Sequence, residues 1–216
     1  MRRKLFKPYI VILTVIAIAF QIGTFFLNGF TFELRLLVFL FLLLMNSHYQ
    51  VINANNANSS SLNFPLLFPI IVFFGPPWAS VMATIGLISL DELELSWPVF
   101  LFNRASLGLA TGLGGLVFHQ AGGLSNLFLA LPVSVVVYAL LNHLLFIIGD
   151  FLRTDGTPKL GFIVLDSLRT IPASAALAAL FYFAFSYLDV LGLLGAYFIF
   201  ITVRSGAFLG HLESNY

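Results

Sequence analysis

The stretch LFLALPVSVVVYALLNHLLFII, residues Leu127–Ile148, contains no Asp, Glu, Lys or Arg. An α-helix needs about 20 predominantly apolar residues to cross the hydrocarbon core of a bilayer. The stretch is long enough, and it therefore predicts a transmembrane helix. Further runs that meet or approach this length lie on both sides of it, at Tyr9–Leu27, Phe100–Phe118, Ile171–Leu188 and Leu191–Leu209.

The composition of the whole chain agrees with repeated insertion into a membrane. Hydrophobic residues make up 60% of the 216 positions and charged residues only 9%, whereas a soluble domain carries about 25% charged residues. Such a chain lacks the polar side chains that would cover a water-exposed surface. Because the apolar runs extend over nearly the full length, we expect one polytopic membrane domain over residues 1–209.

Shorter apolar runs raise the expected number of crossings. They are Phe30–Met45, Phe64–Phe74 and Trp78–Leu90, and the last two flank Gly75-Pro76-Pro77. Proline lacks the backbone N–H and clashes with the preceding turn, so it interrupts a helix. These two runs are therefore either two short tilted spans or a re-entrant pair that neighbouring helices shield from lipid. The expected fold class is an all-α integral membrane protein, a bundle of about six to eight transmembrane helices, some short or re-entrant, with eight favoured.

The distribution of Lys and Arg predicts the orientation in the membrane. With the N-terminus in the cytoplasm and eight crossings, the predicted outer loops near Asn28, Pro76, Gln120 and Asp189 contain no Lys or Arg, and only Arg35 falls towards the outside. An excess of Lys and Arg on the cytoplasmic side is the usual pattern. We therefore expect a multi-pass protein of the cell membrane with both termini in the cytoplasm. The basic residues at predicted inner ends are Arg2, Arg3, Lys4, Lys7, Arg104, Arg153, Lys159, Arg169 and Arg204.

The sequence contains none of the common catalytic or metal-binding motifs. It has no cysteine, which excludes disulfides and zinc–thiolate or iron–sulfur sites. His48, His119, His143 and His211 are scattered at predicted membrane edges, where interfacial histidines are commoner than metal ligands. No Walker loop, HExxH, GxSxG or strand–GxGxxG–helix pattern occurs, and a net charge of +1 without a basic stripe argues against nucleic acid. We expect no enzymatic activity, no cofactor, no metal and no nucleic-acid partner, and the lipid bilayer as the main partner.

Polar residues inside the predicted spans are the candidates for function. A charged side chain at the centre of a membrane helix costs about 2.5–3.5 kcal/mol on insertion scales, so such residues tend to face an interior cavity. One interpretation is structural: Asp166 and Arg169 stand three residues apart and neutralise each other, while Arg104 extends to the headgroups. The other is that polar side chains of several helices converge in a ligand-binding or signalling site inside the bundle. Its residues would be Asn103, Arg104, Asn142, Asp166 and Arg169.

A spaced pattern runs from residue 62 towards the C-terminus. It consists of Leu62-Asn63-Phe64-Pro65, Phe73-Phe74-Gly75-Pro76, Asp91, Trp97, Leu101-Phe102-Asn103, Gly115-Leu116-Val117-Phe118, Gly122-Gly123, Val137-Tyr138 and Leu141-Asn142. Over roughly residues 60–216, this pattern resembles the multi-pass membrane-associated sensor domain that lies N-terminal to HD-GYP phosphodiesterase or GGDEF diguanylate cyclase domains in bacteria. The sequence departs from that family at Arg104 and Ser106, where a small residue and a glutamine are expected.

The resemblance implies a membrane-embedded sensory input domain that relays a signal through its C-terminal helix to a cytoplasmic cyclic-dinucleotide effector domain. That effector would be covalently linked or a separate protein, and a homodimer is expected because signalling helices commonly work in pairs. The apolar run gives way to polar residues beyond Arg204. We therefore expect the helix that begins near Leu191 to continue past Arg204 to at least Leu212, with residues 210–216 as the start of a cytoplasmic connecting helix.

An alternative function belongs to a different class, the substrate-binding membrane component of an energy-coupling-factor vitamin transporter. Such components are similar in size and hydrophobicity, and a Phe-Gly-Pro turn followed by glycine-rich helices would look similar. In that case the first helix would dock a partner membrane protein through small residues. Ala17-Ile18-Ala19 is a faint trace of such a surface.

Overall fold

The computed structural model describes the backbone of residues 2–53, 63–153 and 160–213 and the side chains of residues 4–47, 63–153 and 171–202. Within these residues all regular structure is helical, as the sequence predicts. The helices are α1 (Arg2–Asn28), α2 (Arg35–Asn53), α3 (Asn63–Phe73), α4 (Gly75–Gly86), α5 (Leu90–Leu93), α6 (Trp97–Gln120), the 3-10 helix η1 (Gly123–Asn126), α7 (Leu127–Arg153) and α8 (Leu160–Glu213).

Three helical stretches in the described part of the chain are long and apolar enough to cross a membrane, namely Lys4–Asn28, Gly123–Arg153 and Ile171–Thr202. Large apolar side chains on these helices, such as Ile12 and Phe128, are exposed in the isolated chain. A water-soluble protein rarely exposes apolar surface on this scale, whereas the hydrocarbon core of a bilayer covers it. The helices are therefore those expected of a chain that inserts into a membrane.

The remaining helices are shorter or more polar. At 1.5 Å per residue, the 11 residues of α3 and the 12 residues of α4 form helices about 17 and 18 Å long, against a hydrocarbon core about 30 Å thick. The helix α6 is long enough, but Asn103, Arg104 and its glycines make it less apolar. Length and composition alone therefore identify fewer crossings than the apolar runs predict.

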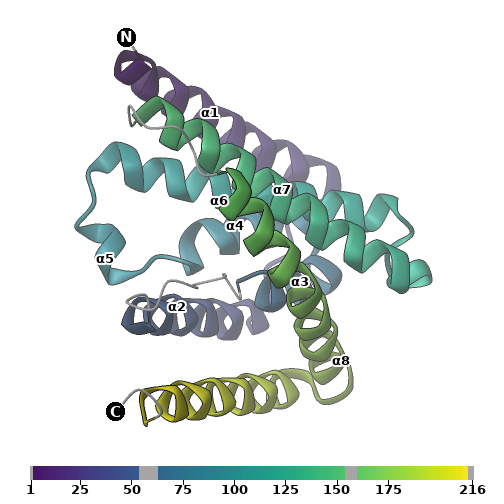
Figure 1. Ribbon diagram of the computed structural model, residues 1–216. Helices are drawn as coiled ribbons and strands as arrows, with labels where there is room; N and C mark the ends of the chain where they lie inside the picture. The colour runs from purple at the N-terminus through teal and green to yellow at the C-terminus, as the bar shows by residue number, and fades with distance from the viewer. Residues whose placement is uncertain (1, 54–62, 154–159, 214–216) are drawn as a thin grey trace.

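The helix α3 lies at the centre of the bundle. Its residues from Asn63 to Ile71 are all buried, and it packs against α2, α4, α6 and α8. A helix that is hydrophobic all round is stable only when every side is covered. In Figure 1, α1 and α7 lie above α3, and α2 and the C-terminal part of α8 lie below it. The neighbouring helices thus shield this short run from lipid, which the sequence predicts for the re-entrant arrangement.

The break at Gly75-Pro76-Pro77 is confirmed, and it occupies very little chain. Only Phe74 separates α3 from α4. Gly75 has a φ of +86°, which glycine adopts without steric cost, and the two prolines lie in the first turn of α4, where a helix leaves its N–H groups unpaired. The predicted span Trp78–Leu90 is wrong at its end, because α4 stops at Gly86 and Ser89 is the N-cap of the separate helix α5.

The helix α8 contains a sharp bend at Asp189, where φ is 51° and ψ is −139°. The bend divides it into a first arm, residues 160–188, and a second arm, residues 190–213, and Figure 1 shows the two arms turning away from each other. The break falls between the two predicted spans in this region. The backbone of the second arm is helical to Glu213, so the predicted continuation past Arg204 is confirmed.

Two features hold the bend of α8. Gly192 allows the arms to approach, because a Cβ atom there would lie 2.0 Å from the carbonyl oxygen of Ala184. Arg35, at the start of α2, pairs with Glu33 and places Nη1 3.6 Å from Oδ1 of Asp189. The same guanidinium lies 5.7 and 5.8 Å from the ring centroids of Phe74 and Phe185. The positive charge of Arg35, which the sequence places towards the outside, is therefore stabilised by two neighbouring carboxylates and two aromatic rings.

Polar contacts inside the bundle fix α6 against α1 and α4. The Gln21 amide donates to Oγ of Ser80 at 3.2 Å and to Oγ1 of Thr84 at 2.9 Å. The Ser80 hydroxyl donates to the carbonyl oxygen of Gly108 at 2.8 Å. A Cβ atom at position 108 would lie 2.4 Å from Oγ1 of Thr84, so a larger residue than glycine would force the Thr84 side chain to shift. These contacts set the position of the α6 turn that carries Asn103 and Arg104.

Candidate functional site

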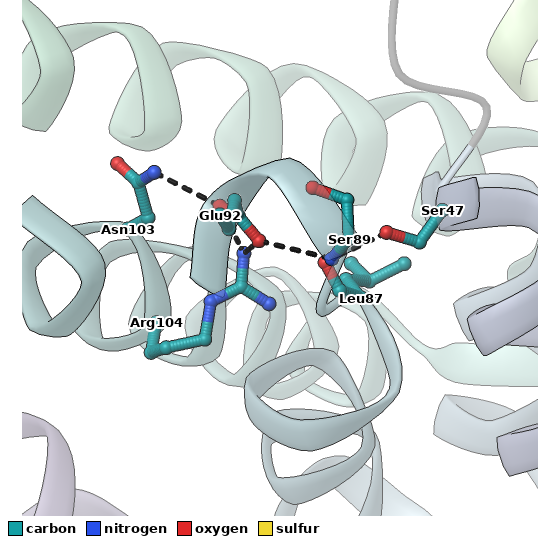
Figure 2. A network of polar contacts seen from close by, with 6 residues as sticks. All are labelled: Ser47, Leu87, Ser89, Glu92, Asn103 and Arg104. Carbon is teal, nitrogen blue, oxygen red and sulfur yellow. Dashed lines mark hydrogen bonds and ion pairs between the residues drawn. The ribbon is translucent and has the colours of Figure 1, made fainter. Parts of the chain in front are cut away.

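A buried ion pair joins α5 to α6. Nη2 of Arg104 lies 2.6 and 2.7 Å from the two carboxylate oxygens of Glu92. Arg104 is 5% exposed, and the Glu92 side chain is 16% exposed. Asn103 Nδ2 donates to Oε1 of Glu92 at 2.9 Å, and the backbone N–H of Ser89 donates to Oε2 at 3.3 Å. Figure 2 shows these groups gathered around one carboxylate.

The local sequence explains how Glu92 reaches this position. Ser89-Leu90-Asp91-Glu92 has the S-x-x-E spacing of a capping box, in which the glutamate turns back to the N-cap backbone. That turn directs the Glu92 carboxylate towards α6 rather than into water (Figure 2). The hydroxyl of Ser47 donates to the carbonyl oxygen of Leu87 at 3.0 Å. This bond ties α2 to the backbone just before α5, so the short helix is anchored on two sides.

Arg104 uses only part of its hydrogen-bonding capacity. In the described part of the chain, its Nε and Nη1 atoms are buried without a hydrogen-bond partner. The ring of Phe100 lies 5.9 Å from its Cζ atom. An ordinary buried donor without a partner costs about 1–3 kcal/mol. The pairing with Glu92 is therefore the main compensation for burying this guanidinium.

A cavity of about 280 Å³ lies beside the ion pair, between α5, α6 and α7. Its apolar walls are Phe102, Leu107 and Phe146. Polar groups also reach it from each of the three helices. They belong to Glu92, Asn103, Ser106, Asn142 and His143.

Ser106 differs from the other polar residues of the cavity. It is 4% exposed, and its hydroxyl has no hydrogen-bond partner among the described residues. Buried hydroxyl groups in proteins nearly always have a partner, which is either protein, water or a ligand. Thr14 and Thr111 carry buried hydroxyl groups of the same kind, but Ser106 is the one of the three that lines this cavity.

A second cavity of about 150 Å³ shares the walls formed by Phe102, Asn103 and Phe146. Asp150 and Arg153, near the end of α7, also line it. Gly149 leaves room for the Phe102 ring, since a Cβ atom there would lie 2.6 Å from Cζ of that ring. The two cavities thus form neighbouring spaces along the α6–α7 interface.

The structure brings together part of the site that the sequence predicts. Asn103 and Asn142 line the same cavity, and Arg104 adjoins it through Glu92. Arg104 is buried in this pair and does not extend to the headgroups. Asp166 and Arg169 lie on the helical backbone of α8, but their side chains, and so their predicted pairing, lie outside the described residues.

Sequence reasoning missed the partner of Arg104. The capping-box spacing of Ser89 and Glu92 was the available signal, because it predicts that the glutamate turns inward. His143, interpreted from the sequence as an interfacial residue, lines the cavity. Across the described residues, no group of three or more His, Asp or Glu side chains gathers as a metal site would require.

Comparisons of the chain with protein-family models, with curated proteins and with solved structures find no match.

Proposed function

We propose that the chain is a membrane-embedded sensory input domain of the inner (cytoplasmic) membrane, with about six to eight crossings and both termini in the cytoplasm. A change in the bundle is relayed through the second arm of α8 to a cytoplasmic cyclic-dinucleotide effector domain, covalently linked or on a separate protein. The observation that carries the proposal is the helical second arm. It starts at the bend and continues beyond the apolar stretch that ends at Thr202.

The geometry of the bend supports a relay. A residue other than glycine rarely adopts a positive φ, so the conformation of Asp189 depends on the contacts around it. A change in those contacts would move the second arm as a rigid body, and small shifts at packed interfaces are amplified in this way. A ligand drives such a movement only if it binds the two arrangements with different affinity.

The arrangement of the helix ends supports the orientation. In Figure 1 the N-terminus, α5 and the C-terminal end of α8 lie on the left, and the bend of α8 lies on the right. The exposed Lys4 and Lys7 are at the N-terminal end of α1, and the exposed Arg153 is the last residue of α7. An excess of basic residues marks the cytoplasmic side, so α5 and its ion pair lie near the cytoplasm in the proposed orientation.

The packing of α1 divides the surface expected for the transporter alternative. Ala17, its first small residue, is 4% exposed and packs with Ile10 and Leu13 against residues of α6. Ile18 and Ala19 are exposed, so a partner membrane protein could contact α1 at these two residues. The observation that favours the sensory function is the second arm of α8, which the transporter alternative does not require.

A chimera tests the relay. The full chain is fused after Tyr216 to the catalytic domain of a diguanylate cyclase, and cyclic-di-GMP production is measured in membranes. Asn142→Leu changes the cavity wall, and we expect it to alter production about fivefold or more, the lower end of ordinary allosteric coupling. Three glycines inserted between Gly210 and Glu213 should abolish this difference, because a flexible segment does not transmit movement.

The matched control inserts seven helix-forming residues at the same point. Seven residues add about two turns at 3.6 residues per turn, so the helix keeps its phase and the response to Asn142→Leu should persist. A response that survives the glycine insertion would contradict the relay through α8. So would a folded Asn142→Leu chimera with unchanged production.

A further inference from the structure

We infer that the cavity between α5, α6 and α7 binds a small molecule without net charge that combines a hydrogen-bonding group with a flat apolar body. The inference deepens the proposed sensory function, on which it rests for its biological role. It is carried by three features of the cavity: its balanced charges, the unpartnered Ser106 hydroxyl and its aromatic walls.

The two ionised groups beside the cavity, Glu92 and Arg104, balance each other within the protein, and His143 is a further titratable side chain in the cavity wall. The Glu92 carboxylate is paired with Arg104 and also accepts hydrogen bonds from Asn103 and Ser89. A cation entering the cavity would therefore find a carboxylate whose charge and lone pairs are in use. An anion would not reach Arg104, which is not part of the cavity wall and directs Nη2 to Glu92. A charge buried without a partner is strongly unfavourable, so the balance favours an uncharged ligand.

The polar groups that remain can both donate and accept. The Ser106 hydroxyl is buried and has no partner among the described residues. Asn103 uses its Nδ2 on Glu92, and Figure 2 shows its amide oxygen turned away from that carboxylate. Asn142 adds an amide group from α7. A primary amide, or another neutral group with both a donor and an acceptor, matches this set.

The walls set the shape of the rest of the ligand. Phe102 from α6 and Phe146 from α7 line the cavity together with Leu107. Aromatic rings pack favourably against other rings in stacked or edge-to-face arrangements. The volume of about 280 Å³ lies just below the range for ligand pockets, which is about 300–1,000 Å³. The ligand is therefore expected to be close in size to one substituted ring.

Three matched compounds test the inference: benzamide, benzoate and benzylamine. They share a ring but are neutral, anionic and cationic at pH 7. Binding to the purified full-length chain in lipid nanodiscs is measured by ligand-observed NMR, with empty nanodiscs as the reference for partition into lipid. We expect benzamide to bind, and benzoate and benzylamine to bind at least about tenfold more weakly, a difference that such titrations resolve.

Variants locate the binding. Ser106→Leu and Asn142→Leu fill the cavity from two helices and should each weaken benzamide binding about tenfold or more. Ser125→Leu makes the same change as Ser106→Leu at an exposed position in η1 and should leave binding unchanged. Two independent variants are used so that loss of fold in one, checked by thermal melting, leaves the other to decide.

The ligand class, the binding site and the relay would each be contradicted by a different result. Benzamide binding no stronger than that of benzoate or benzylamine would overturn the ligand class. Equal benzamide binding to the original chain and to a folded Asn142→Leu variant would overturn the site, and so would an absence of binding, which indicates a cavity filled by water alone. Binding as expected together with a chimera that does not respond would leave the ligand site standing and contradict only the relay.

Discussion

Glu92→Gln is expected to lower the free energy of unfolding by about 3–5 kcal/mol, the usual cost of removing one partner of a buried ion pair. Glutamine has nearly the same shape as glutamate, so the cavity walls stay in place. The change leaves the guanidinium of Arg104, which is 5% exposed, without its counter-charge. Unfolding by SDS or heat in mixed micelles measures the loss.

Glu94→Gln is the matched control. Glu94 follows α5 directly and is exposed, so neutralising it should change stability by less than about 0.5 kcal/mol, as is usual for surface substitutions. The double variant Arg104→Met/Glu92→Gln should lose less free energy of unfolding than the sum of the losses in the two single variants, because no unpaired charge remains. Equal effects of Glu92→Gln and Glu94→Gln, or additive effects in the double variant, would show that the ion pair is not formed.

Gly192→Ala is expected to open the bend of α8. A Cβ atom at this position would lie 2.0 Å from the carbonyl oxygen of Ala184, and a backbone atom cannot move away as the end of a flexible side chain can. Overpacking of this kind usually costs about 1–3 kcal/mol and shifts the backbone. The two arms should therefore separate, and the contact between Arg35 and Asp189 should be lost.

Spin labels measure the separation. Because the chain has no cysteine, cysteines introduced at Leu180 and Ile199 are the only labelling sites, and both positions are exposed. In Gly192→Ala the distance between the labels should increase. Gly195→Ala is the control, since a Cβ atom there meets nothing within 4 Å. An unchanged distance in Gly192→Ala would contradict the close approach of the arms.

The sequence predicts the helical elements well because their causes are local. The uncharged run Leu127–Ile148 lies within α7, and Gly75-Pro76-Pro77 separates α3 from α4. Asp189, between two apolar runs, is the point at which α8 bends. The ends of the helices are less well predicted. The predicted run ends at Met45, but α2 continues to Asn53, through residues whose polar character favours a loop.

The site is harder to predict because its contacts join distant elements. In the predicted site, Asp166 of α8 is the acidic residue that could pair with Arg104. The described partner of Arg104 is instead Glu92, from the short helix α5. That pairing depends on where the chain turns after Gly86, which hydrophobic periodicity does not reveal. The cavity depends in the same way on packing, since Ser106 and Asn142 line one cavity only because α6 lies against α7.

Cysteine labelling in intact cells tests most directly whether the chain is a multi-pass membrane bundle with Glu92 and Arg104 at its cytoplasmic end. Leu93→Cys lies in α5 beside Glu92, and Leu124→Cys lies in η1 at the opposite end of α6, and both positions are exposed. A membrane-impermeant maleimide should label Leu124→Cys in intact cells, and Leu93→Cys only after the membrane is permeabilised. Labelling of Leu93→Cys in intact cells to the same extent as Leu124→Cys would contradict this topology.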